Sequence, residues 1–236
     1  MCGRYVLTSP IEAIAKAFEV ESPAVSWVAR YNIAPGTEIP VVRRAEDGAR
    51  ELVPLHWGLV PSWMKERPRD RPMINARSET AAEKPSFRAA MRRRRCLVPA
   101  DGFYEWKKVR GGKQPCLMRR PADALFAFAG IGERWEAPDG SVLESCALLT
   151  THPNATMAEV HNRMPVVLPP EAFSDWLDPA APLDLLTPLF EPVGDDYFTI
   201  QPVSTRVNSP RHDDELCLAP PGSLAAGEPG TQGDLF

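Results

Sequence analysis

The sequence predicts a single-domain α+β fold, in which a curved, barrel-like antiparallel β-sheet forms the core and a few helices lie at its periphery. Three observations lead to this prediction. Many short β-like runs alternate with few helical patterns, no unit is repeated, and a chain of 236 residues with 44% hydrophobic residues can bury one good core. No apolar run approaches the roughly 18 residues of a membrane-spanning helix, so we expect no membrane association.

The first third of the chain predicts one helix, three strands and a long loop. Apolar residues recur at helical spacing over about 10–19, and Ser9-Pro10-Ile11-Glu12 has the pattern of a capping box with Pro at the first helical position. Residues 25–31 predict a short strand that leads into a turn. Residues 38–44 and 50–57 flank a Glu-Asp-Gly-Ala turn and predict a β-hairpin. The Pro-rich stretch that follows predicts an exposed loop carrying Trp63.

The remaining elements follow from the same patterns. A helix is expected from about Ser86 to the four arginines at 92–95, which we interpret as a solvated helix end because four successive helical residues cannot share one face. Asn154 is expected to cap a short helix that contains Met157 and His161. Strands are expected at 96–109, 114–120, 124–131, 143–151, 166–168 and 196–204, with helical segments at 169–177 and 184–190.

Composition changes at Ala219, beyond which Pro, Gly, Ser and Ala dominate and apolar residues are few. Such a segment cannot bury enough apolar surface to fold, so we predict one domain at 2–218 and a disordered tail at 219–236. The N-terminus lacks the charged and apolar regions of a secretory signal. We therefore expect a cytoplasmic protein, associated with the nucleoid if the source is bacterial.

Charge is distributed unevenly along the chain. Residues 1–120 hold 23 Lys and Arg against 13 Asp and Glu, which leaves 4 and 18 for the rest of a chain whose net charge is −4. A basic half could bind a polyanion such as nucleic acid. The alternative is that folding interleaves the two halves and cancels the field.

Five cysteines are present, and no two have the spacing of a Cys-x-x-Cys pair. The odd number and the spacing argue against a disulfide framework and against a cysteine zinc cluster. Cys96, Cys116 and Cys146 lie in apolar or β-like runs and are expected to be small buried hydrophobic residues. Since no two of the four histidines have metal-ligand spacing either, we predict no metal and no cofactor.

Cys2 lies one peptide bond from the start of the chain. If Met1 is removed, Cys2 carries an α-amine and a thiol on adjacent carbons, with ordinary pKa values of about 7.7–8.0 and 8.5. Both groups would then be partly nucleophilic near neutral pH without burial or a partner. An amine and a thiol so placed suit an aldehyde, which they convert into a five-membered thiazolidine, and also suit amide hydrolysis. The alternative is an incidental second residue.

Asn75 and Arg77 lie in Pro-Met-Ile-Asn-Ala-Arg-Ser-Glu-Thr at 72–80. Asn is awkward in an apolar strand, but its amide can orient an amine or a carbonyl group. In an extended segment Arg77 would point to the same side as Asn75. The alternative is a turn-forming Asn next to a solvent-exposed Arg.

Glu105 and His161 are candidates for proton transfer. Aromatic neighbours at 103–106 could desolvate the Glu105 carboxylate and raise its pKa, unless Glu105 is exposed and pairs with a lysine at 107–108. His161 precedes Arg163 by two residues, and a histidine with a near-neutral pKa can shuttle protons. The alternative for His161 is a structural role.

Several motifs occur together in a fixed order: MCGRY at the start, RYNIAPG at 30–36, HWGLVPSW at 56–63, INARSET at 74–80, FYEW at 103–106 and HNRMP at 161–165. In this combination the chain closely resembles the SRAP (SOS response-associated peptidase) family over about residues 2–218. The resemblance implies the fold of that family and a monomer. It also implies recognition of abasic sites in single-stranded DNA, with covalent attachment through the N-terminal cysteine and removal of Met1 that the family itself may catalyse.

The resemblance also implies roles for individual residues. Cys2 would be the crosslinking nucleophile, Asn75 would hold it, Glu105 would act as acid and base, and His161 would protonate the departing ring oxygen of the sugar. The remaining residues of the predicted site would contact DNA: phosphates for Arg4, Arg77 and Arg163, stacking or wedging for Trp63 and Met64, and further contacts for Lys84 and Thr150. At Met64 the family often has an aromatic residue.

Three other functions fit parts of the pattern. Glutamine amidotransferases with an N-terminal nucleophile also begin with Met-Cys-Gly, but the motifs of their oxyanion hole are missing here. A thiol peptidase could use the cysteine, asparagine and histidine as a papain-like set. A single-strand DNA binder would need none of this chemistry. Ammonia release from glutamine, cleavage of other proteins, and lesion protection without Cys2 would distinguish the three.

Overall fold

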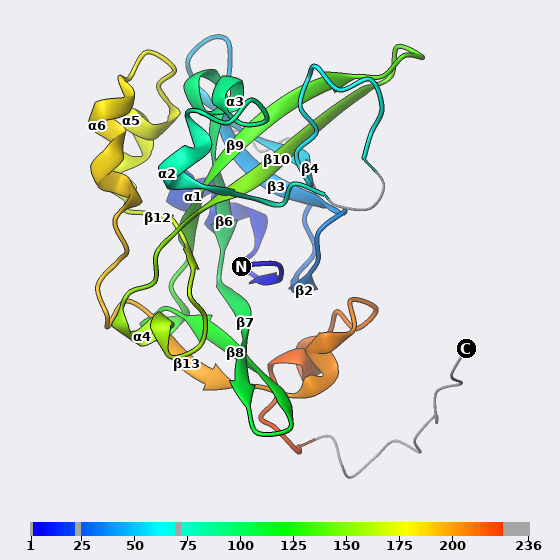
Figure 1. Cartoon of the computed structure of the whole chain (residues 1–236), viewed down its shortest axis with the longest axis vertical. Helices are drawn as coiled ribbons and strands as arrows, with labels where there is room; N and C mark the ends of the chain where they lie inside the picture. Colours follow the sequence, from blue (N-terminus) through cyan, green and yellow to red (C-terminus); the bar gives the residue numbers. More distant parts are fainter. Residues whose placement is uncertain (1, 22–24, 69–71, 224–236) are drawn as a thin grey trace.

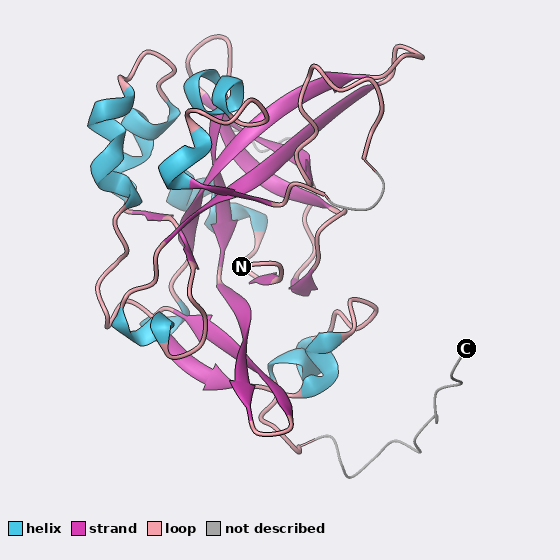
Figure 2. Cartoon of the chain, in the orientation of Figure 1, coloured by secondary structure: helices cyan, strands magenta, loops and turns pink. Residues whose placement is uncertain are grey.

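The structure is a computed structural model that describes residues 2–21, 25–68 and 72–223. At its centre five strands close into a barrel in the order β4–β3–β6–β9–β10, because β10 pairs with β9 on one edge and with β4 on the other (Figures 1 and 2). The barrel strands are β3 (Glu38–Arg44), β4 (Arg50–Trp57), β6 (Arg95–Ala100), β9 (Phe126–Glu136) and β10 (Val142–Thr151). The predicted α+β fold with a barrel-like core is confirmed.

Two pairings in this sheet are parallel rather than antiparallel. Both β4 and β5 (Asn75–Arg77) run parallel to β10, with which they pair at Ser145–Cys146 and Leu148–Thr150 respectively. Since β9 occupies the opposite edge of β10, the strands β4 and β5 follow one another along the same edge. The loop that begins at Gly58 connects them, and Trp63 on this loop is exposed as predicted.

A second, five-stranded sheet holds the N-terminus in its interior. The strand order is β13–β8–β7–β1–β2, so the first strand lies between two others. Cys2 lies three residues before β1. The strands are β1 (Tyr5–Leu7), β2 (Arg30–Ile33), β7 (Gly102–Val109), β8 (Gly112–Arg119) and β13 (Thr199–Pro202), and β2 replaces the strand expected at 25–31.

Asp101 divides the predicted strand 96–109 into β6 and β7, which belong to different sheets. Its carboxylate accepts hydrogen bonds from the backbone N–H and hydroxyl groups of both Thr8 and Ser9. The Ser9 backbone N–H, which the Glu12 side chain would accept in a capping box, therefore already has a partner, and helix α1 (Ile11–Phe18) begins one residue later than expected, with Pro10 as its N-cap and no side-chain hydrogen bond. The predicted capping box is wrong because Asp101 binds Ser9 outside the helix end.

Short helices and strands cover the outside of the barrel (Figure 2). Asn154 caps α4 as predicted, because its side chain accepts from the Met157 N–H, but His161 lies beyond the end of this helix. No helix in the three described ranges is long and apolar enough to cross a membrane. The remaining elements are α2 (Ser78–Ala81), α3 (Arg88–Arg93), β11 (Met164–Pro165), β12 (Val167–Leu168), α5 (Phe173–Leu177) and α6 (Leu183–Leu186).

The arginine run at 92–95 is a solvated helix end only at Arg92 and Arg93, which are exposed. Helix α3 ends at Arg93, and Arg95 begins β6 with only 4% of its surface exposed. Its guanidinium group donates to the backbone carbonyl groups of Met91, Trp176 and Asp178. Of the predicted tail 219–236, residues 224–236 lie outside the described residues, so the domain boundary at 218 stays a prediction.

Candidate active site

Cys2 is fully enclosed and belongs to the main hydrophobic core. The Asn75 amide Nδ2 donates to the Cys2 carbonyl oxygen at 2.8 Å, and the Cys2 thiol lies 4.0 Å from the carbonyl oxygen of Arg4. Asn75 is fixed in turn because it opens β5 and pairs with Leu148 of β10. The structure therefore brings together two of the predicted site residues, which are 73 positions apart in the sequence.

Burial changes the chemistry expected of this thiol. Desolvation raises the pKa of Cys2 far above its ordinary range, and the negative charge of Glu105 raises it further. The ordinary thiol pKa assumed from the sequence therefore does not apply to the enclosed Cys2 of this structure. A thiol in this position needs a nearby base to remove its proton before it can act as a nucleophile.

Glu105 is the carboxylate whose negative charge raises the pKa of that thiol. It lies in β7 opposite Cys116 of β8 and is 3% exposed. Its burial rules out the alternative of an exposed Glu105, and the neighbouring Lys107 pairs with Glu159. A buried carboxylate whose charge acts on a buried thiol is suited to moving a proton between the two.

His161 follows α4, and its ring is oriented by the backbone of Arg163. The Arg163 N–H donates to His161 Nδ1 at 3.0 Å. Nδ1 also lies 3.1 Å from the Arg163 carbonyl oxygen, so the backbone of Arg163 fixes the orientation of the ring whichever tautomer is present. The ion pair of Lys107 in β7 with Glu159, two residues before His161, ties the loop of His161 to the strand that carries Glu105.

Arg163 is held from two sides. Its guanidinium group forms two hydrogen bonds with the Glu79 carboxylate, at 2.5 and 2.9 Å, and also donates to the Thr150 carbonyl oxygen at 2.5 Å. Thr150 itself is fully buried and pairs with Arg77 across the β5–β10 ladder. Arg163, Thr150 and Arg77 therefore form one connected group beside Asn75.

The third predicted phosphate ligand, Arg4, has an internal role. Its guanidinium group donates to Asn32 Oδ1 and to the Val207 carbonyl oxygen, both at 2.8 Å, and to the Asn208 carbonyl oxygen at 3.4 Å. These contacts tie the segment after Cys2 to the chain near residue 208. Phosphate binding by Arg4 stays a prediction.

The predicted stacking residues lie on the loop between β4 and β5. Trp63 is 62% exposed, and its indole N–H donates to the Pro85 carbonyl oxygen at 3.3 Å, next to the exposed Lys84. Met64 is half-buried, and its carbonyl oxygen accepts from the Trp135 indole at 2.7 Å. Of these side chains, only that of Trp63 presents a large apolar surface to solvent.

Sequence reasoning missed Glu79, Ser78 and Asn32. Glu79 and Ser78 belong to the INARSET motif, and Asn32, which accepts from Arg4, belongs to RYNIAPG, so their place in a motif was the available signal. The Ser78 hydroxyl and Asn75 Oδ1 are buried, and neither has a hydrogen-bond partner among the described residues. Buried polar atoms without partners are costly, and these two lie at either end of the four-residue segment 75–78, whose first residue binds the Cys2 carbonyl oxygen.

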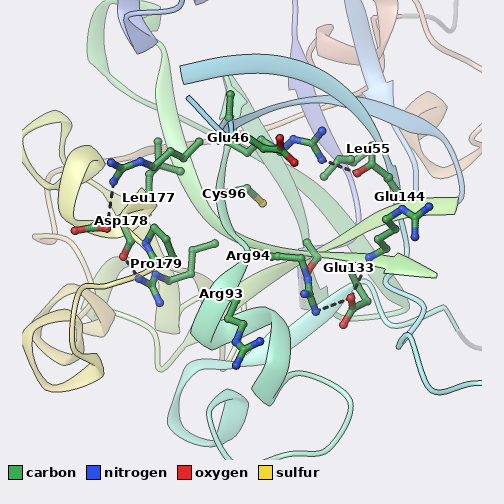
Figure 3. A pocket seen from close by; sticks show the side chains of 16 residues that line it. Glu46, Leu55, Arg93, Arg94, Cys96, Glu133, Glu144, Leu177, Asp178 and Pro179 are labelled. Carbon is green, nitrogen blue, oxygen red and sulfur yellow. Dashed lines mark hydrogen bonds and ion pairs between the residues drawn. The ribbon is translucent and has the colours of Figure 1, made fainter. Parts of the chain in front are cut away.

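A second charged region lies at the other end of β10. A cavity of about 390 Å³, which we call the arginine cavity, is lined by residues that include Arg43, Arg44, Arg94, Arg95 and Cys96 (Figure 3). Three of these arginines already pair with carboxylates: Arg43 with Glu51 and Glu144, Arg44 with Asp178, and Arg94 with Glu133. Cys96 is buried, and burial raises the pKa of its thiol to about 12.

Together, these features describe a barrel protein with a buried cysteine at position 2 that is held by the Asn75 amide and influenced by the Glu105 carboxylate. The profile of the SOS response associated peptidase (SRAP) family matches residues 1–210, and the chain belongs to this family.

Relatives and solved structures agree with this assignment. The chain is 40% identical to the abasic site processing protein YoqW of Bacillus subtilis, over 90% of this chain and 96% of that one. It is 32% identical to the abasic site processing protein HMCES of Mus musculus, over 99% and 80% of the two chains. A crystal structure of a protein from Bacteroides thetaiotaomicron matches the fold with a TM-score of 0.81 at 23% identity, covering 93% of this chain and 99% of that one. A phage-related protein from Bordetella bronchiseptica matches with a TM-score of 0.70 at 32% identity, covering 86% and 94%.

Proposed function

We propose that this protein recognises abasic sites in single-stranded DNA and links covalently to them through Cys2, which protects the lesion. The observation that carries the proposal is the position-2 cysteine held by Asn75 and influenced by Glu105. The names of the curated relatives, abasic site processing proteins, support the same substrate. They do not favour the alternative of an amidohydrolase or a general thiol peptidase.

The chemistry joins one aminothiol to one aldehyde with loss of one water. After Met1 is removed, the Cys2 amine attacks the C1′ aldehyde of the ring-opened sugar, and water leaves to give an imine. The Cys2 thiol then adds to the imine carbon, its proton passes to the nitrogen, and a five-membered thiazolidine closes. No oxidant, reductant or cofactor is needed.

The buried groups around Cys2 supply the proton transfers. Glu105 accepts the thiol proton and returns it to the nitrogen, which a buried thiol of raised pKa requires. His161 donates a ring proton to the ring oxygen of the sugar as the ring opens, and it assists the loss of water. Asn75 keeps the Cys2 backbone in place, while its buried Oδ1 is available to accept from the substrate.

The DNA backbone is bound by the cationic residues near this site. Arg77 and Lys84 are exposed, and Arg163 donates to Thr150, which is the strand partner of Arg77. Arg4 contributes at the segment after Cys2. Trp63, with Met64 next to it, stacks on a base beside the lesion, which suits recognition that does not depend on sequence. We expect the protein to act as a cytoplasmic monomer.

A denaturing gel tests the proposal. Purified protein is mixed with a single-stranded oligonucleotide that contains one abasic site, and a shifted band is expected that survives denaturation. The matched control is the same strand with an intact base, which should give no shifted band. A duplex with an internal abasic site should react more slowly than the single strand. No shifted band with the abasic strand would refute covalent capture.

Removal of Met1 is part of the same proposal. Either the chain cleaves itself or an aminopeptidase of the host removes the residue. Intact mass spectrometry of the purified protein should show loss of one methionine. If the chain cleaves itself, variants Glu105→Gln and His161→Ala should retain Met1, whereas a host aminopeptidase should process them like the wild type.

A further inference from the structure

Glu79 lies between two of the arginines that the proposed function assigns to DNA phosphates. It is the second residue of α2, directly after the Arg77–Ser78 step from β5 into that helix. Its two carboxylate oxygens accept separate hydrogen bonds from the Nη1 and Nη2 groups of Arg163. The hydrogen bonds from Arg163 lower the pKa of Glu79, and the nearby charge of Arg77 lowers it further. The carboxylate is therefore ionised at neutral pH.

The two partners of this ion pair are unequally buried. The Arg163 side chain is 15% exposed, whereas the Glu79 side chain is 48% exposed. Arg163 is also anchored by the Thr150 carbonyl oxygen, a contact that does not involve Glu79. Glu79 can consequently turn out into solvent at little cost to its own hydration, while Arg163 keeps its hydrogen bond to Thr150 of β10 and its charge becomes available to a phosphate.

A carboxylate that binds a guanidinium group through two oxygens uses the same donors that a phosphate would use. We propose that Glu79 is an internal phosphate surrogate: it occupies Arg163 in the DNA-free protein and is exchanged for a backbone phosphate when DNA binds. This role rests on the proposed function. Its consequence is that Glu79 weakens binding to single-stranded DNA in general, so that stable attachment depends on the covalent step at an abasic site.

The exchange changes how binding depends on salt. A cation that is not neutralised within the protein contributes a slope of about −0.7 in log K against log salt for each single-strand phosphate it binds. In the wild type, Glu79 already neutralises Arg163, so a phosphate that replaces Glu79 adds little to that slope. In Glu79→Gln, Arg163 is no longer neutralised and its full contribution appears.

Fluorescence anisotropy with a labelled, lesion-free single strand measures this effect at 50–200 mM salt. Glu79→Gln should bind more tightly than the wild type, with a slope steeper by about 0.7. Its advantage should therefore be about 2.6-fold larger at 50 mM than at 200 mM salt. Glu83→Gln removes an equal charge from an exposed position in the same segment and serves as the matched control. Thermal unfolding checks that each variant is folded.

Two results overturn the role of Glu79. Equal or weaker binding by Glu79→Gln means that the carboxylate only positions Arg163. A gain that persists in an Arg163→Met background, or that Glu83→Gln reproduces, means that net charge alone is responsible. Crosslinking of the wild type to an abasic strand is followed in parallel. Absence of a crosslink refutes the proposed function, whereas a normal crosslink with unchanged salt dependence in Glu79→Gln refutes only the surrogate.

Discussion

The two ends of β10 carry similar kinds of residue, but these residues differ in whether their polar groups have partners within the protein. Near Val142–Ser145, the arginine cavity combines several arginines, several carboxylates and a buried thiol, Cys96. Near Leu148–Thr151, the Cys2 site combines the same kinds of group with fewer charges. In the cavity most charged groups have protein partners, whereas beside Cys2 two buried polar atoms, Asn75 Oδ1 and Ser78 Oγ, have none within the described part of the chain.

This difference between neutralised arginines and unpartnered polar atoms shows which feature indicates a catalytic site. When neighbouring carboxylates neutralise a cluster of arginines in a cavity, little positive charge is left to bind a ligand. Buried polar atoms without partners cost free energy in the empty protein, and a substrate that hydrogen-bonds to them recovers that cost. The less charged of the two regions, beside Cys2, is for this reason the better candidate for catalysis.

The largest expected effect separates the two buried thiols. Cys2→Ala removes the sulfur that closes the ring and should abolish the crosslinked band on a denaturing gel. Cys96→Ala alters a thiol of the arginine cavity, and its folded protein should crosslink at the wild-type rate. A band of wild-type intensity from Cys2→Ala would place the reaction elsewhere and remove the basis of the comparison.

The next effect concerns stability rather than chemistry. Arg95→Met in the arginine cavity leaves the buried carbonyl groups of Met91 and Trp176 without their donor. It should lower the free energy of unfolding by about 3 kcal/mol, because hydrogen bonds to buried charged groups are lost. Urea denaturation measures this change, and the variant should still crosslink below its unfolding transition.

Arg163→Met is the matched variant at the Cys2 site. Its ion pair with Glu79 is partly exposed, so the loss should be only about 1 kcal/mol of stability. Its affinity for single-stranded DNA should fall instead. If Arg163→Met proves as destabilising as Arg95→Met, the two regions do not differ in the way the comparison requires.

How much of the structure the sequence predicts depends on how far apart the interacting residues lie along the chain. The hairpin of β3 and β4 was predicted with its observed bounds, because its turn at Gly48, with φ of +90°, is encoded by adjacent residues. The capping box failed because Asp101, 92 residues from Ser9, binds the Ser9 backbone N–H that the capping box requires. The interpretation of Arg95 failed for the same reason, since its acceptors on Trp176 and Asp178 are more than 80 residues away.

The candidate site shows the same limit. The identities of Cys2, Asn75, Glu105 and His161 follow from motifs, but no local pattern reveals that Cys2 is enclosed or that Glu79 pairs with Arg163, 84 residues away. These contacts are set by the parallel pairing of β5 with β10, which places residues 75–77 beside 148–150. Parallel partners leave no turn signature between them, so the sequence alone could not place them.

A moderate effect is expected for Asn75→Ala, which removes the 2.8 Å hydrogen bond to the Cys2 carbonyl oxygen. A hydrogen bond of this kind contributes about 1–1.5 kcal/mol, so crosslinking should slow by roughly 5- to 12-fold. Asn75→Asp keeps the shape but cannot donate when ionised, and it should be slowed at least as much. The rate comes from gel time courses at saturating DNA. Unchanged rates in both variants would show that Asn75 does not position Cys2.

The smallest effect is a shift in the pH at which the Cys2 thiol loses its proton. It is measured as thiolate absorbance near 240 nm, with the absorbance of Cys2→Ala subtracted from that of the wild type. Because burial and the negative charge of Glu105 both disfavour the thiolate, the wild-type signal should be absent at pH 7 and appear only in the alkaline range. Glu105→Gln removes the charge but not the burial, which is the larger cause. The pKa of Cys2 in this variant should therefore fall, while remaining above that of an exposed cysteine. The pKa of Cys96 in the arginine cavity is raised by burial and not by a carboxylate, so it should be unaffected. A thiolate already present at pH 7 in the wild type would mean that Cys2 is solvated in solution, and the need for Glu105 as its base would disappear.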